Sequence, residues 1–140
     1  MEGCAAVEVP PTNPTKKRVL LAEDDLRLRV ALTRVLGGAG YDVVVVSDGA
    51  EALGMLQAGS AFDLVVTDSR MPLVSGPELV RALRGAGSTI PVVLLSGAPP
   101  EPGQIREWQR LGGVTWMQKP FDVRGLLVVL ARALGEGTSG

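Results

Sequence analysis

The sequence predicts an α/β domain in which helices cover both faces of a five-stranded parallel sheet. Five short apolar runs alternate with five stretches of helical periodicity along the chain, and turn residues separate them. Strands that alternate with helices pair in parallel, because each helix returns the chain to the edge where the previous strand began. The composition fits one globular domain with a buried core, since 46% of the 140 residues are hydrophobic and 21% are charged.

The first half of the chain carries three predicted strands and two helices. The strands are the short apolar runs at residues 18–22, 43–46 and 63–67. After the first strand, apolar residues recur at helical spacing from Leu28 to Leu36, and a group of glycines ends that helix. After the second strand, Asp48 is the expected helix cap, with Glu51 three residues later as in a capping box. This helix is expected to run to about residue 59.

The second half of the chain continues the alternation. A helix with Pro77 in its first turn comes first, and strands are predicted at residues 91–95 and 114–118. The helix between these strands is expected to begin near Gly103 and to be shorter than the others. The reason is the Pro-rich segment 99–102, whose prolines lack amide donors and restrict their neighbours. Asp122 is expected to cap the last helix.

The order of the strands follows from the handedness of their connections. Right-handed crossovers leave few arrangements for five parallel strands, and the flavodoxin-like order 2-1-3-4-5 is the predicted one. The predicted domain covers residues 18–135. Residues 1–17 contain three prolines and no periodic pattern, so they are expected to form a flexible lead, and residues 136–140 a polar tail.

The composition argues against several classes of function. A net charge of −1 indicates neither a nucleic-acid surface nor a membrane surface. The absence of histidine excludes a Ser-His-Asp triad and most zinc sites. The single cysteine, Cys4, cannot form a disulfide within the chain, which fits a reducing compartment. No apolar run is long enough for a membrane helix, and no signal peptide is recognisable, so a cytoplasmic location is expected.

Charged and polar side chains stand at the carboxyl ends of four predicted strands. Glu23 and Asp24 follow the first strand, Asp68 the third, Ser96 the fourth and Lys119 the fifth. These ends meet at one edge of a parallel sheet, which is where open α/β sheets bind ligands. Three carboxylates at one edge repel one another unless a cation neutralises them, and Mg2+ prefers oxygen ligands. A carboxylate nucleophile, a cation, a lysine and a hydroxyl group together indicate phosphoryl transfer to an aspartate.

Each of these residues also has a purely structural interpretation. Asp24 and Asp25 are typical helix caps, Asp68 and Ser96 are typical turn residues, and a lysine at a strand end is usually solvated. Their joint placement at four strand ends favours the functional interpretation.

One protein family combines all of these features. Glu23-Asp24, Asp68 with Met71-Pro72 and Gly76, Ser96-Gly97 and Lys119-Pro120-Phe121 together resemble the receiver domain of two-component response regulators. The resemblance covers about residues 18–135. It implies that Asp68 is the phosphoacceptor for a sensor histidine kinase or a histidine phosphotransfer protein. Such a domain assists its own phosphorylation and dephosphorylation and is not an enzyme in the usual sense.

The resemblance also implies roles for the residues around Asp68. Mg2+ would be held by Glu23, Asp24, Asp68 and the backbone carbonyl of Arg70. Lys119 would contact the phosphoryl oxygens, Ser96 would move to hydrogen-bond them, and Trp116 would be the switch aromatic. Pro120 would follow a cis peptide bond. The face formed by the fourth helix, the fifth strand and the fifth helix would then control a protein partner, which the sequence does not name. Receivers often pair through this face, so a homodimer stays open.

The sequence departs from the family pattern at four places. Its first acid is Glu23 where Asp is usual, and its switch aromatic is Trp116 where Tyr or Phe is usual. The Pro-rich segment 99–102 stands where the fourth helix usually begins. Arg70 stands two residues after the acceptor, beside the reaction. The sequence leaves open whether the chain is a stand-alone receiver, which its Met1 favours, or a segment of a hybrid kinase.

Three other functions compete with this interpretation. A receiver-like module that binds proteins without being phosphorylated is the main alternative. A phosphatase of the haloacid dehalogenase type would need a second Asp at position 70, where Arg70 stands. A nucleotide-binding protein would need a phosphate-binding Gly-rich loop after the first strand, where Glu23, Asp24 and Asp25 repel phosphate.

Overall fold

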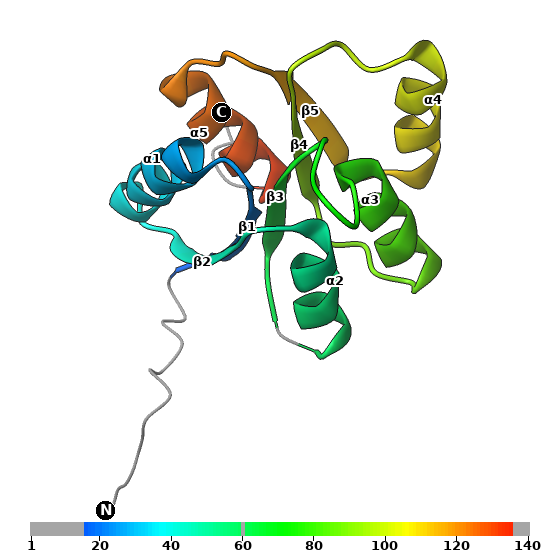
Figure 1. The fold of residues 1–140 in the computed structure, drawn as a ribbon, viewed down its shortest axis with the longest axis horizontal. Helices are drawn as coiled ribbons and strands as arrows, with labels where there is room; N and C mark the ends of the chain where they lie inside the picture. Colours follow the sequence, from blue (N-terminus) through cyan, green and yellow to red (C-terminus); the bar gives the residue numbers. More distant parts are fainter. Residues whose placement is uncertain (1–15, 60, 136–140) are drawn as a thin grey trace, which may run out of the picture.

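The computed structural model describes residues 16–59 and 61–135, which form a parallel sheet with helices on both faces (Figure 1). The strands are β1 Arg18–Ala22, β2 Asp42–Val46, β3 Leu64–Asp68, β4 Val92–Ser96 and β5 Val114–Gln118. The helices are α1 Leu26–Gly38, α2 Gly49–Gln57, α3 Gly76–Gly85, α4 Pro102–Leu111 and α5 Val123–Ala133. The sheet order β2-β1-β3-β4-β5 confirms the predicted fold class and topology. Residues 1–15 of the predicted lead and the predicted tail 136–140 lie outside the described residues.

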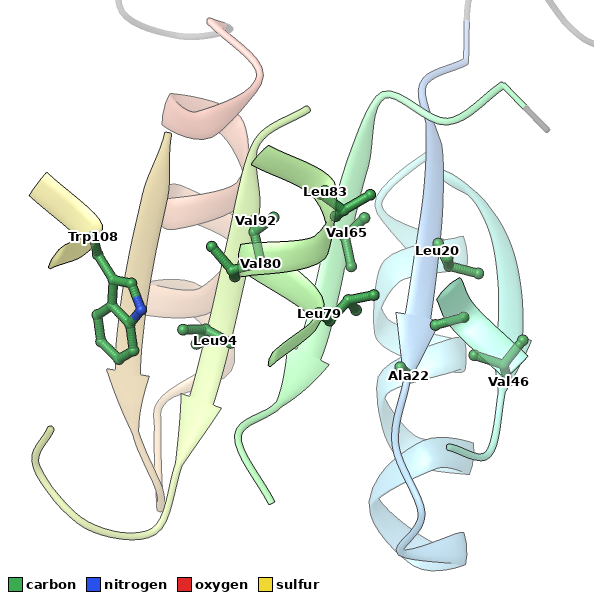
Figure 2. Close-up of a cluster of buried hydrophobic side chains, with 11 residues drawn as sticks. Leu20, Ala22, Val46, Val65, Leu79, Val80, Leu83, Val92, Leu94 and Trp108 are labelled. Carbon is green, nitrogen blue, oxygen red and sulfur yellow. The ribbon is translucent and has the colours of Figure 1, made fainter. Parts of the chain in front are cut away.

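The two faces of the sheet carry separate hydrophobic cores. Helices α1 and α5 cover one face, and α2, α3 and α4 cover the other (Figure 1). Alternate residues of a strand point to opposite faces, so Leu20 of β1 packs beneath α2 and α3 while Leu21 packs beneath α1 and α5. Figure 2 shows the first of these cores, which Trp108 of α4 closes at the β5 edge. Burial on both faces explains why β1, β3 and β4 are continuous apolar runs.

Helix α4 corrects one prediction. It was expected to be shorter than the others, but it has ten residues, as many as α3 and one more than the nine of α2. Its proline, Pro102, occupies the first helical position, where a helix needs no amide donor. The backbone N–H of Glu101 donates to Oε1 of Gln104 at 3.0 Å, which closes the first turn. Pro99 and Pro100 therefore precede the helix, Pro102 begins it, and none of them interrupts it.

The helix caps agree with the sequence only in part. The side chain of Asp48 caps α2 by accepting from the backbone N–H of Glu51 at 2.7 Å. The Glu51 carboxylate, however, accepts from the backbone N–H of Ser47 at 3.0 Å, one residue before Asp48, whose N–H is the expected donor. Asp122 stands at the predicted cap position of α5, but its side chain makes no capping hydrogen bond there. Asp25 caps α1 by accepting from the backbone N–H groups of Arg27 and Leu28, which agrees with its structural interpretation as a helix cap.

None of the helices within residues 16–59 and 61–135 combines the length and the apolar character that crossing a membrane requires.

Candidate functional site

Three carboxylates converge at the carboxyl edge of the sheet. Strands β1 and β3 are neighbours, and their register pairs Ala22 with Thr67, so the next residues, Glu23 and Asp68, emerge side by side. One carboxylate oxygen each from Glu23, Asp24 and Asp68 lies within 4.8 Å of the others. Glu23 is fully buried, Asp68 is 8% exposed, and Asp24 faces the solvent. The cluster is therefore open to solvent on the Asp24 side.

Lys119 supplies the positive charge of this cluster. Its Nζ donates to Oδ2 of Asp68 at 2.9 Å and lies 3.5 Å from Oε1 of Glu23. Its backbone N–H donates to the carbonyl of Ser96 at 2.7 Å, which ties the end of β5 to the end of β4. Burial alone lowers the pKa of the Lys119 ammonium, but the hydrogen bond to Asp68 and the charges of Asp68 and Glu23 raise it above its ordinary value. The ammonium is thus charged at neutral pH. The peptide bond from Lys119 to Pro120 is cis, as the resemblance implied.

Glu23 is a fully buried acid of this cluster, and its burial has an electrostatic cost. Burial raises its pKa to about 7, and the charge of Asp68 adds to this rise, although the Asp25 backbone N–H and Lys119 oppose it. Its Oε2 accepts from that N–H at 3.1 Å, whereas Oε1 accepts no hydrogen bond within the described residues, although the Lys119 ammonium lies 3.5 Å away. A buried carboxylate oxygen without a donor is suited to a cation or to a water held by one. An all-oxygen donor set of this kind fits Mg2+.

The raised pKa of Glu23 predicts a pH-dependent stability. Between its ordinary value of 4.5 and about 7, the folded state binds the proton more tightly than the unfolded chain, so its contribution to stability falls as the pH rises. We expect Glu23→Gln to raise the free energy of unfolding of the metal-free protein by about 2 kcal/mol at pH 8 and by much less at pH 5. Urea unfolding in EDTA at both pH values measures this difference.

Asp24→Asn is the matched control for Glu23→Gln, because it removes an exposed carboxyl group from the same cluster. A stability gain from Glu23→Gln that is equal at pH 5 and pH 8 would contradict the assignment of the charge cost to Glu23.

Three other predicted residues are not among the three clustered carboxylates. The hydroxyl of Ser96 donates to the carbonyl of Ala98 and accepts from the Ala98 N–H at 3.3 Å, so it is engaged in the β4–α4 loop. Trp116 lies half-buried on β5, where it lines an open pocket of about 260 Å³ between α4 and β5. Arg70 is exposed, and its backbone N–H donates to Oδ1 of Asp68 over a long 3.4 Å. The local partner of the Ser96 hydroxyl agrees with the structural interpretation of Ser96 as a turn residue.

A family model described as the response regulator receiver domain matches residues 19–131, which is most of the chain. The chain belongs to the response regulator receiver family. The resemblance inferred from the strand-end residues is therefore confirmed, and it places this receiver domain in two-component signalling.

Curated relatives of this receiver domain are longer proteins. Response regulator protein FleR of Pseudomonas aeruginosa is 38% identical over 120 residues, which cover 85% of this chain and 25% of FleR. DNA-binding transcriptional regulator NtrC of Rhizobium meliloti is 34% identical over 122 residues, with coverages of 87% and 25%. The regulatory protein SphR of Synechococcus elongatus is 35% identical over 134 residues, with coverages of 90% and 51%. The chain thus spans about a quarter to a half of these relatives.

Solved receivers match this receiver domain over nearly their whole length. Chemotaxis response regulator CheY4 of Vibrio cholerae is 33% identical with a TM-score of 0.75, and the match covers 86% of this chain and 100% of CheY4. The receiver domain of the Francisella response regulator 1452 is 27% identical with a TM-score of 0.77, with coverages of 86% and 98%. These neighbours confirm the flavodoxin-like fold.

Proposed function

We propose that this receiver domain accepts a phosphoryl group on Asp68 from a histidine kinase or a histidine phosphotransfer protein and switches a protein partner in response. The observation that carries the proposal is the Asp68 carboxylate itself. It has a lysine ammonium at 2.9 Å and two further carboxylates within 4.8 Å, at the edge of the sheet where ligands bind. A carboxylate in such surroundings is suited to be a phosphoryl acceptor.

Mg2+ is the cofactor that this donor set would hold. Its proposed ligands are Glu23, Asp24, Asp68 and the backbone carbonyl of Arg70. When bound, Mg2+ neutralises the carboxylates and polarises the phosphoryl oxygens. The buried Oε1 of Glu23, which accepts no hydrogen bond within the described part of the chain, is the observation that favours a cation here.

The chain's own residues supply the acceptor and its surroundings. An oxygen of Asp68 forms a bond to phosphorus, and the bond from phosphorus to the donor's imidazole nitrogen breaks, so that the electron pair leaves with the imidazole. The Lys119 ammonium already lies at Oδ2 of Asp68 and would donate to a phosphoryl oxygen arriving there. Because Asp68 is only 8% exposed, the donor group must approach from the open side of the cluster, next to Asp24.

The switch would start at Ser96. Its hydroxyl must leave Ala98 before it can hydrogen-bond a phosphoryl group, which frees space near the end of β4. Trp116 on β5 would respond, because the open pocket between α4 and β5 leaves its side chain room to move. A change of this kind is a shift between two states that phosphorylation stabilises differently. The surface of α4, β5 and α5 would then favour or release a protein partner, which includes a second copy of the chain.

Intact-mass spectrometry of the wild-type chain tests the proposal. After incubation with acetyl phosphate and Mg2+, we expect a mass increase of one phosphoryl group that disappears when EDTA replaces Mg2+. A chain that stays unmodified and also fails to bind beryllofluoride with Mg2+ would support the alternative, a binding module that is never phosphorylated. The second measurement is needed because an adduct that hydrolyses rapidly also escapes detection by mass.

A further inference from the structure

The loop between β3 and α3 contains a strained turn beside the proposed acceptor. The backbone N–H of Val74 donates to the carbonyl of Pro72 at 2.8 Å, and Leu73 between them has a φ of 72°. A three-residue turn with a positive φ at its centre is rare and strained, most of all for a bulky residue. The Leu73 side chain is 79% exposed, so its own burial does not offset the strain. Contacts elsewhere must hold the turn in this shape.

Both ends of this loop are fixed to the sheet. The backbone N–H of Ser69 donates to the carbonyl of Leu95 at 2.8 Å, and that of Gly76 donates to the carbonyl of Ser69 at 3.1 Å. Gly76 also lies tightly against the acceptor strand, because a Cβ there would be 2.7 Å from the carbonyl oxygen of Asp68. Between these ends, the Met71 and Val74 side chains pack against the core, and the Arg70 N–H donates to Oδ1 of Asp68 over a long 3.4 Å, so Arg70 is held by the weakest contact of the loop.

The loop backbone at Val74 lies close against Gly49, the first residue of α2. A Cβ built on Gly49 would lie 1.8 Å from the carbonyl oxygen of Val74 and 2.7 Å from its carbonyl carbon. This contact joins backbone to backbone, so no side-chain rotation can relieve it. The first turn of α2 is itself fixed by the Asp48 cap and by the Glu51 hydrogen bond to Ser47. A side chain at position 49 would therefore displace the loop rather than the helix.

We propose that Gly49 is a positioning residue for the metal site. Its contact with the Val74 backbone holds the β3–α3 loop in its strained shape and thereby sets the position of the Arg70 carbonyl. This inference rests on the proposed function, in which that carbonyl is a Mg2+ ligand. Mg2+ demands nearly ideal octahedral geometry at short ligand distances, so a displaced carbonyl weakens its binding.

The test is calorimetric titration of Mg2+ into metal-free Gly49→Ala and Gly54→Ala. Both variants add one methyl group to α2, but a Cβ at Gly54 meets no atom within 4 Å. We expect Gly49→Ala to weaken Mg2+ binding by about tenfold or more, in the range found for residues that orient metal ligands. Gly54→Ala is expected to bind Mg2+ as the wild type does. Circular dichroism confirms that both variants are folded, so that the difference reports on the site.

A second pair of variants keeps the test decisive if Gly49→Ala does not fold. Leu73→Gly relieves the strained turn, and the double variant Gly49→Ala/Leu73→Gly lets the loop yield to the new methyl group at lower cost. We expect the double variant to bind Mg2+ about tenfold more weakly than Leu73→Gly alone. Equal affinities within either pair would overturn the role of Gly49. A wild-type chain that binds no Mg2+ would instead overturn the proposed function.

Discussion

Asp68→Asn is expected to abolish phosphoryl incorporation from acetyl phosphate. The amide of Asn has no anionic oxygen to attack phosphorus, and neither of the neighbouring acids occupies the position bonded to Lys119 at 2.9 Å. Loss of a nucleophile lowers the rate of reaction by about three orders of magnitude or more. The remaining adduct would be too scarce for intact-mass spectrometry to detect. The initial rate of adduct formation in Mg2+ measures the effect.

Asp63→Asn is the control for this substitution. Asp63 immediately precedes β3, at the end of the strand opposite to Asp68, and it accepts a hydrogen bond from the backbone N–H of Arg18 at 2.8 Å. We expect Asp63→Asn to be phosphorylated like the wild type. Phosphorylation of Asp68→Asn at a comparable rate would mean that another side chain is the acceptor.

Lys119→Met is expected to impair both stability and phosphorylation. It removes the ammonium that lies 2.9 Å from Asp68 and 3.5 Å from Glu23, and so leaves two buried carboxylates without a nearby cation. Breaking a fully buried pair costs about 3–5 kcal/mol, and partial solvent screening of Lys119 reduces the expected loss to about 1–2 kcal/mol. The rate of phosphorylation is expected to fall by about 100-fold, as for other donors that stabilise developing charge.

Two measurements check the prediction for Lys119. Urea unfolding in EDTA gives the loss of stability, and adding Mg2+ is expected to restore part of it, since the ion supplies positive charge to the same carboxylates. Adduct formation with acetyl phosphate gives the rate. Lys17→Met, at an exposed position, is the control for a lost lysine. A rate for Lys119→Met within threefold of this control would show that Lys119 does not contact the transferred group.

The residues at the strand ends could be predicted from the sequence, because the carboxyl ends of parallel strands always meet at one edge of the sheet. Once β1, β3 and β5 were recognised as apolar runs, Glu23, Asp68 and Lys119 had to emerge at the same edge. Helix α4 was not predictable in the same way. Its length depends on whether Pro102 stands at the first helical position or inside the helix, and composition does not distinguish these two cases.

The bond between the Ser96 hydroxyl and Ala98 is the local turn that this residue type favours, but the residue type alone does not show whether that turn forms. The feature that the sequence missed is a contact between two segments with no shared pattern. The approach of Gly49 to Val74 joins positions 25 residues apart, and it depends on how α2 packs beside the β3–α3 loop. The only hint of this contact in the sequence was Gly49 itself, a glycine at the start of a helix, where most other residues are better helix formers. Such a glycine can indicate close backbone approach, but it does not name the partner.

The most direct test of the central proposal is to locate the phosphoryl group on the wild-type chain. Borohydride reduces an aspartyl phosphate to homoserine but leaves phosphate esters of serine and threonine unchanged. The chain would be treated with acetyl phosphate and Mg2+, reduced, digested and sequenced by mass spectrometry. We predict homoserine at position 68 and nowhere else. Reduction at Glu23, at Asp24 or at an acid outside the cluster, with Asp68 unmodified, would contradict the assignment of Asp68 as the phosphoacceptor.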